Sequence, residues 1–143
     1  MAKRETKKKS KGSAGNNRKI GNNFLQKNAQ KPEVIETASG LQYQIIEKIE
    51  GTHPDEWSAL TIHQRAMLLN GSLLEDTYRQ NKPDELNLNE MIEGLQEGLQ
   101  LMTKGSRFKF WIPAELAWGK KGTGNKIPPN AVLHFDIRLI DFS

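Results

Sequence analysis

Strict alternation of apolar and polar residues marks several strands in this chain. In residues 133–139 every odd position is leucine, phenylalanine or isoleucine, and the even positions are His134, Asp136 and Arg138. Residues 41–45 and 107–112 follow the same period of two, which is typical of a strand with one buried face. We therefore predict that the odd side chains of 133–139 and the even ones of 108–112 point inward, and that His134 is solvated.

A turn signal decides the assignment of residues 60–69. Alanine, leucine, methionine and arginine in this segment favour a helix by intrinsic propensity. The pair Asn70-Gly71 then stands between two apolar pairs. Asn-Gly in such a position is the strongest short-range hairpin signal, because both turn positions require positive φ. We therefore predict a strand over residues 60–69 that enters a hairpin.

Helical periodicity appears in residues 89–104. Asn89 can cap the first turn, and Lys104-Gly105 provides a basic C-terminus and a stop. Gly94 and Gly98 weaken the helix, but their spacing lets another backbone approach closely on that side. The apolar positions that share one face are Ile92, Leu95 and Leu99.

The predicted elements define an α+β fold in which a curved antiparallel sheet wraps around one short helix. Residues 23–30 can add about two turns of helix, which must end at Lys31 because a residue before proline avoids the α region. The short length of this segment predicts a monomer, since an isolated helix below about 12 residues is marginal.

Charge divides the chain into two unequal parts. Residues 1–31 contain ten lysines and arginines against one acid, Glu5, whereas the remainder holds eleven basic and sixteen acidic side chains. The basic segment has almost no apolar residues to bury, so we expect it to be disordered. We predict a disordered basic tail over residues 1–22, a short helical stub and linker over 23–36, and a folded domain over 37–143.

Most conventional chemistry is excluded by composition and spacing. The chain has no cysteine, and its three histidines show no ligand spacing, so we predict no metal and no cofactor. The stretch GKKGTGN at residues 119–125 departs from both the phosphate-loop and the dinucleotide patterns. No segment has the length of a membrane span or the apolar core of a secretory signal, so we expect a cytoplasmic location and no membrane partner.

Four motifs together carry a family resemblance. They are TASGLQY at 37–43, LLNGSLLED at 68–76, EGLQEGLQLMTKGSRFKFWIPAELAWG at 93–119 and NKIPPNAVLHFDIRLIDF at 125–142. In this order they resemble the FKBP-type peptidyl-prolyl isomerases, and the junction FLQKNAQKPEVIETASGLQY at 24–43 is similar to the bacterial Mip-type branch. The family fold is a half-barrel of antiparallel strands around one short helix, in agreement with the predicted plan.

The resemblance implies a rotamase that assists protein folding by binding proline-containing, unfolded or flexible polypeptides. In the family, the glycine-rich loop and the Ile-Pro-Pro turn after it form one flap of an apolar pocket. Rotation about an X-Pro bond is opposed by amide resonance, with a barrier of about 20 kcal/mol. The twisted amide is less polar than the planar one, so an apolar pocket with a nearby donor favours it.

Ten positions of this chain match the family's pocket. The resemblance implies a catalytic role for four of them: Glu75, Ile92, Trp118 and Phe135. It implies substrate binding for the other six: Gln64, Leu74, Leu86, Met91, Leu95 and Ile127. Gln64, Leu74, Leu86 and Leu95 stand where the family usually has aromatic residues, which predicts a wider pocket, reduced activity and weakened binding of macrolide inhibitors.

Two alternatives to an active isomerase stay open at this point. The first is a catalytically weak FKBP-like module that binds peptides as a chaperone. The second is a nucleic-acid or ribosome-associated factor that the basic tail anchors, because lysine-rich segments bind phosphate backbones without sequence specificity. Any such nucleic-acid contact is predicted to lie in residues 1–22.

Overall fold

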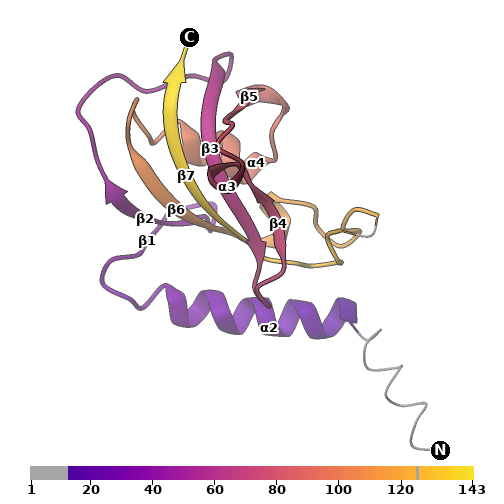
Figure 1. Cartoon of the computed structure of the whole chain (residues 1–143). Helices are drawn as coiled ribbons and strands as arrows, with labels where there is room; N and C mark the ends of the chain where they lie inside the picture. Colours follow the sequence, from indigo (N-terminus) through magenta and orange to yellow (C-terminus); the bar gives the residue numbers. More distant parts are fainter. Residues whose placement is uncertain (1–12, 125) are drawn as a thin grey trace, which may run out of the picture.

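A single antiparallel sheet organises the computed structural model, which describes residues 13–124 and 126–143. Its strands are β1 (Ile35–Glu36), β2 (Gln42–Glu47), β3 (Ala59–Leu68), β4 (Leu73–Asp76), β5 (Asp84–Asn87), β6 (Arg107–Ile112) and β7 (Leu133–Phe142). The helices are α2 (Ser13–Asn28), α3 (Thr77–Gln80) and α4 (Glu93–Leu99), with short 3₁₀ turns η1 (Leu88–Glu90) and η2 (Ala114–Leu116). The α+β half-barrel predicted from the sequence is confirmed (Figure 1).

The strand order is β1-β2-β6-β7-β3-β4, and β5 pairs with the other end of β3. The longest ladder joins β3 to β7 from Leu60↔Phe142 to Leu68↔Leu133. Strands β4 and β5 pair with different halves of the same edge of β3. The site described below lies beside β5 and the start of α4.

The predicted inward faces are confirmed on both long C-terminal strands. Phe108, Phe110 and Ile112 of β6 are at most 2% exposed, and the odd positions of residues 133–139 are all buried. Helix α4 packs against β6 through its two glycines. A methyl group on Gly94 would lie 2.5 Å from Ile112 Cγ2, and one on Gly98 would lie 2.6 Å from Phe110 Cε1. The expected close approach is therefore present, although side chains rather than a backbone fill the space.

Helix α4 is shorter than predicted. It begins at Glu93 and ends at Leu99, so the expected boundaries at residues 89 and 104 are wrong. Asn89 lies in η1 and does not cap α4, because Met91 and Ile92 between them are extended, with ψ of 167° and 152°. The extended pair separates the 3₁₀ turn from the helix.

The predicted hairpin between β3 and β4 is confirmed, but its turn differs from the expected two-residue type. Leu68 O accepts a hydrogen bond from Gly71 N at 3.0 Å, and Leu68 N donates to Ser72 O. Only Gly71 of the turn pair has positive φ, at 92°. The loop is thus a three-residue connection closed by a left-handed glycine, which is the next most common hairpin geometry.

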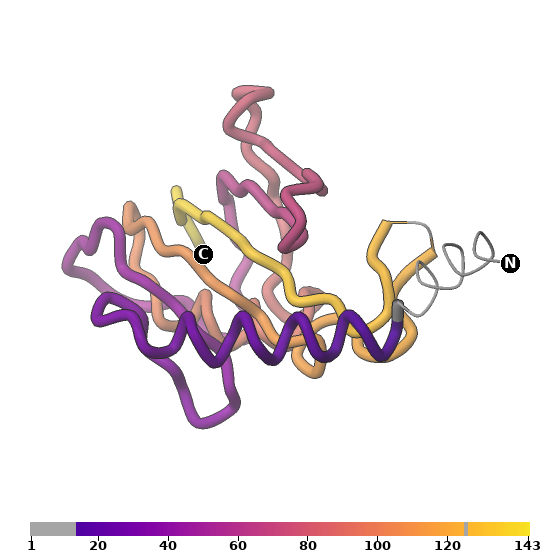
Figure 2. The backbone as a smooth tube through the Cα atoms, turned by 90° about the horizontal axis from the view of Figure 1, so that it is seen from below, coloured from indigo at the N-terminus to yellow at the C-terminus, as the bar shows by residue number. Residues whose placement is uncertain are grey.

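One register row on the outer face of the sheet runs across four strands. Gln42 pairs with Trp111, Trp111 with His134, and His134 with Met67. Helix α2 covers this row, and Asn28 Nδ2 donates to Gln42 Oε1 at 2.9 Å. Figure 1 shows α2 beneath the sheet, and Figure 2, viewed from below, shows it crossing in front of β6 and β7.

Two predictions are corrected by α2. The helix begins at Ser13 rather than at residue 23, so the disordered tail expected over residues 1–22 is wrong for 13–22; residues 1–12 lie outside the described part of the chain. His134 is partly buried rather than solvated, and its ring stacks on Trp111 at 5.0 Å with an interplanar angle of 6°. Tertiary contacts order a segment of low helix propensity, and the ordered helix then buries a face that alternation alone assigns to solvent.

Candidate functional site

An apolar cavity of about 530 Å³ opens beside β5, between the start of α4 and the segment after η2. Its lining residues are Gln64, Leu86, Glu90, Met91, Ile92, Glu93, Leu95, Ala117, Trp118 and Phe135. The cavity has the size typical of small-ligand and peptide side-chain pockets.

The floor and walls come from separate elements. Leu95 of α4 and Phe135 of β7 are 4% and 7% exposed and form the deep part. Met91 and Ile92 reach the cavity because they are extended, and Gln96 Nε2 holds the Met91 carbonyl oxygen at 2.8 Å. Trp118 lies at the rim with 46% of its surface exposed. A rigid apolar floor thus faces a more accessible aromatic side chain.

Seven of the ten residues named from the family resemblance line this cavity: Gln64, Leu86, Met91, Ile92, Leu95, Trp118 and Phe135. The structure does not bring the other three into the lining. Leu74 and Ile127 are partly buried against the hydrophobic core, and Glu75 lies on β4. The roles assigned to these residues by resemblance stay predictions.

Sequence reasoning missed three lining residues, Glu90, Glu93 and Ala117. Each of them is adjacent in sequence to a residue that was named, so the signal was their position beside Met91, Ile92 and Trp118. A peptide in this cavity would therefore meet carboxylates at one edge as well as apolar walls.

Gln64 is a polar residue at a position where the family usually has an aromatic one. Gln64 is 8% exposed, and its Nε2 donates to Asp84 Oδ2 at 2.9 Å. Burial and then the neighbouring Asp84 carboxylate raise the pKa of Glu75 above its ordinary value. Asp84, which sequence reasoning did not single out, therefore connects the cavity wall to Glu75. This arrangement holds the Gln64 side chain in place without a ring.

The glycine-rich loop beside the cavity forms what we call the flap, residues 117–124 and 126–131. Its two arms meet at a bridge between Thr123 and Ile127 and at a hydrogen bond of 2.8 Å from Asn130 N to Gly119 O. Gly122 has φ of 66°, and a methyl group there would overlap the Ile127 carbonyl oxygen. Glycine at this position therefore allows the arms to approach and holds Trp118 at the cavity rim.

The chemistry available to this cavity is apolar contact and hydrogen bonding. No histidine is in its lining, and the described residues contain no group of three or more histidine or acidic side chains arranged for a metal ion. Within the same residues, no helix is both long enough and apolar enough to cross a membrane. The fold is thus a half-barrel sheet with an apolar cavity between its central helix and the flap.

The chain belongs to the FKBP family. Residues 50–140 match the model described as FKBP-type peptidyl-prolyl cis-trans isomerase. Residues 1–45 match the model of the domain amino-terminal to such isomerases.

Relatives agree with this assignment. The chain is 40% identical over 135 residues to an FKBP-type peptidyl-prolyl cis-trans isomerase FkpA of Aeromonas hydrophila, covering 94% of this chain and 50% of that protein. It is 36% identical to the outer membrane protein MIP of Legionella longbeachae, covering 98% of this chain and 59% of the relative. The crystal structure of FkpA from Escherichia coli superposes with a TM-score of 0.89 at 32% identity, covering 99% of this chain and 66% of that one. The chain thus spans about half the length of the curated relatives it matches.

Proposed function

We propose that this chain is a peptidyl-prolyl cis–trans isomerase that binds X-Pro segments of unfolded or flexible polypeptides in the cavity beside Trp118. The observation that carries the proposal is the apolar cavity itself, whose lining includes seven of the positions expected from the family. The buried floor of Leu95 and Phe135 suits a proline ring. A protein with this cavity could act in folding without a nucleophile, metal or cofactor.

The cavity would act by favouring the twisted amide over the planar one. Twisting removes amide resonance and reduces polarity, so apolar walls oppose the planar ground state more than the transition state. The indole N–H of Trp118 is a donor at the rim, where it could bind a substrate carbonyl oxygen. A gain of about 4 kcal/mol would correspond to roughly a thousandfold in rate.

Reduced activity is part of the proposal. Leu95 and Gln64 provide less ring surface than the aromatic residues usual at these positions, so proline should be held less tightly. Restoring the aromatic floor with Leu95→Trp should tighten binding of macrolide inhibitors. Peptides that carry a bulky apolar residue directly before proline should be the preferred substrates.

The test is kcat/KM on an Ala-Leu-Pro-Phe peptide for the wild type, Trp118→Ala and Trp118→Phe. Trp118→Phe keeps a ring and removes the donor, so it should cost about 0.5–1.5 kcal/mol of transition-state stabilisation. Trp118→Ala should cost more. Peptide binding with no measurable turnover by the wild type would overturn the enzyme and leave a peptide-binding chaperone module.

A nucleic-acid contact through the basic N-terminal segment is a second candidate, because residues 1–31 carry ten basic side chains and one acid. Its test is RNA and DNA titration at several salt concentrations with and without residues 1–12, a truncation that leaves α2 intact. Undiminished affinity after this truncation would exclude residues 1–12 as the binding segment.

A further inference from the structure

The flap beside the candidate cavity is held at its base by two hydrogen bonds that share Asn130. Asn130 N donates to Gly119 O, one residue from Trp118. The Asn130 side chain donates in another direction, from Nδ2 to Ala14 O of α2 at 2.9 Å. Asn130 has φ of 58°, a left-handed conformation that lets its backbone and side chain serve the two partners at once.

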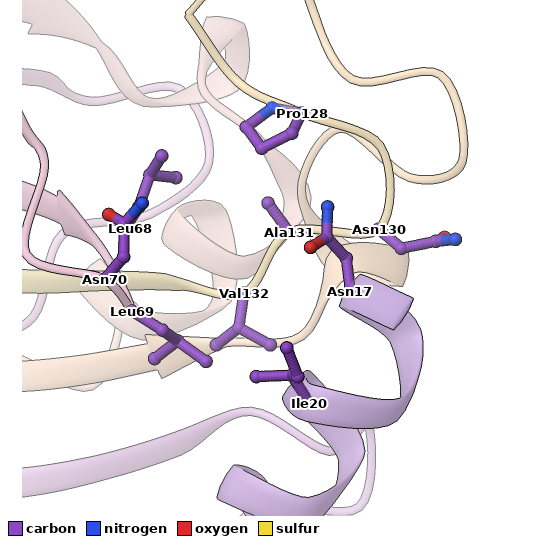
Figure 3. A pocket seen from close by; sticks show the side chains of 9 residues that line it. All are labelled: Asn17, Ile20, Leu68, Leu69, Asn70, Pro128, Asn130, Ala131 and Val132. Carbon is purple, nitrogen blue, oxygen red and sulfur yellow. The ribbon is translucent and has the colours of Figure 1, made fainter. Parts of the chain in front are cut away.

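Helix α2 makes two further contacts with the same short segment. Asn17 Nδ2 donates to Pro129 O at 3.0 Å. Gly21 is buried, and a methyl group there would lie 2.9 Å from Val132 Cγ2. Figure 3 shows Asn17 on the first turns of α2 facing the segment that carries Pro128, Asn130 and Ala131. The N-terminal half of α2 is therefore docked on residues 129–132, directly after the flap turn.

The rest of this half of the helix is not packed. Ile20 is 49% exposed and faces a groove of about 130 Å³ between α2, the β3–β4 turn and residues 128–132. The groove lies between this part of α2 and the hairpin, so the helix is attached here through the Asn17 and Asn130 hydrogen bonds and the packing of Gly21 on Val132. The first turns of α2 contain glycine and asparagine, which are poor helix formers, so these contacts also order the helix.

We infer that α2 positions the flap of the isomerase cavity, with Asn17 and Asn130 as positioning residues that act through Gly119 on Trp118. The inference rests on the proposed function, since the flap matters only if the cavity binds peptide. The attachment is reciprocal: contacts that order the start of α2 also restrict the flap, and loss of either one loosens the other. The amino-terminal segment thereby positions one wall of the cavity without contacting substrate.

The experiment compares Asn17→Asp with Asn16→Ala in the full chain. Aspartate has the shape of asparagine but cannot donate to Pro129 O, and an acidic residue near a helix N-terminus does not oppose the helix. Asn16 is exposed and has no side-chain hydrogen bond among the described residues, so Asn16→Ala controls for a change at a neighbouring position of the helix. Asn130→Asp is a second variant, because aspartate also tolerates the positive φ and lacks the side-chain N–H donor.

Two readouts decide the matter. In Asn17→Asp and Asn130→Asp, amide hydrogen exchange at Thr123, Ile127 and Asn130 should accelerate about fivefold, with β6 and β7 amides unchanged. The value of kcat/KM should fall about threefold to tenfold, mainly through KM, whereas Asn16→Ala should match the wild type in both measurements. Equal exchange in Asn17→Asp and Asn16→Ala, or uniform acceleration that includes β6 and β7, overturns the inference.

The two proposals fail in different ways. An inactive wild type with accelerated flap exchange in Asn17→Asp overturns the enzyme and retains the attachment of α2 to the flap. In that case, peptide affinity replaces kcat/KM and should fall by a similar factor. Accelerated flap exchange with unchanged peptide binding and turnover overturns the inferred control of the cavity by α2.

Discussion

A pair of glycines in the flap separates the effect of backbone conformation from the effect of crowding. Gly119 and Gly122 both have left-handed φ, at 62° and 66°. A methyl group on Gly119 would meet nothing within 4 Å, whereas one on Gly122 would overlap Ile127 O and lie 2.8 Å from the Pro128 carbonyl carbon. Alanine at either position suffers the same backbone strain, but only Gly122→Ala also displaces the opposite arm.

The expected magnitudes follow from these two contributions. Left-handed φ costs a non-glycine residue about 1 kcal/mol, which applies equally to Gly119→Ala and Gly122→Ala. Forcing a methyl group against well-placed backbone atoms costs a further 1–3 kcal/mol, roughly, for Gly122→Ala alone. If the cavity requires the observed flap, Gly122→Ala should have a kcat/KM about tenfold or more below that of Gly119→Ala.

The assay is kcat/KM on the Ala-Leu-Pro-Phe peptide, with the free energy of unfolding of each variant measured by denaturant titration. Both variants should remain folded, because no flap residue belongs to the fully buried core cluster, against which Ala117, Ile127 and Ala131 only pack. The reasoning is refuted if the two variants have the same kcat/KM, since displacement of Ile127 and Pro128 would then be irrelevant to the cavity. It is also refuted if Gly119→Ala is the more damaging change.

Three further predictions concern the rest of the domain. Burial lowers the pKa of His134 below its ordinary value of 6.5, so the contribution of the neutral ring to stability is complete above that pH and is lost as the pH falls. The variant His134→Phe retains stacking on Trp111 but has no proton to take up. Between about pH 7 and 5, its free energy of unfolding should therefore fall less than that of the wild type. Burial and then the Asp136 carboxylate raise the pKa of Tyr78 to about 12, so Asp136→Asn should lower this pKa in an ultraviolet absorbance titration but leave it above 10. The same change removes the negative charge and leaves one acceptor for the paired bonds of 2.9 and 2.8 Å from Arg107, so it should cost about 1 kcal/mol of stability. The chain should sediment as a monomer, because α2 packs on the sheet of its own chain; the shortness expected from the sequence is no longer the reason. A dimer mass that is independent of concentration would contradict this prediction.

The sequence by itself determined the inner half of the sheet. Alternation in residues 107–112 and 133–139 identifies the buried faces, because a strand's side chains have a period of two and one face must meet the core. The hairpin at Gly71 could also be predicted, since a left-handed turn position favours glycine. Seven lining residues of the cavity followed from family motifs, because these motifs preserve positions that fold together from distant segments.

Only the tertiary structure decided the extent of α2 and the character of the outer face. The bonds that hold the start of this helix reach Pro129 and Asn130, 112 and 116 residues further along the chain. Local sequence patterns cannot predict a contact between such distant residues, so a segment rich in glycine and asparagine is predicted to be a disordered tail. Once α2 is docked, Gln42 becomes fully buried and His134 lies against Trp111, although both occupy positions that alternation assigns to solvent. Alternation distinguishes the two faces of a strand, but which of them is covered depends on the elements that pack there.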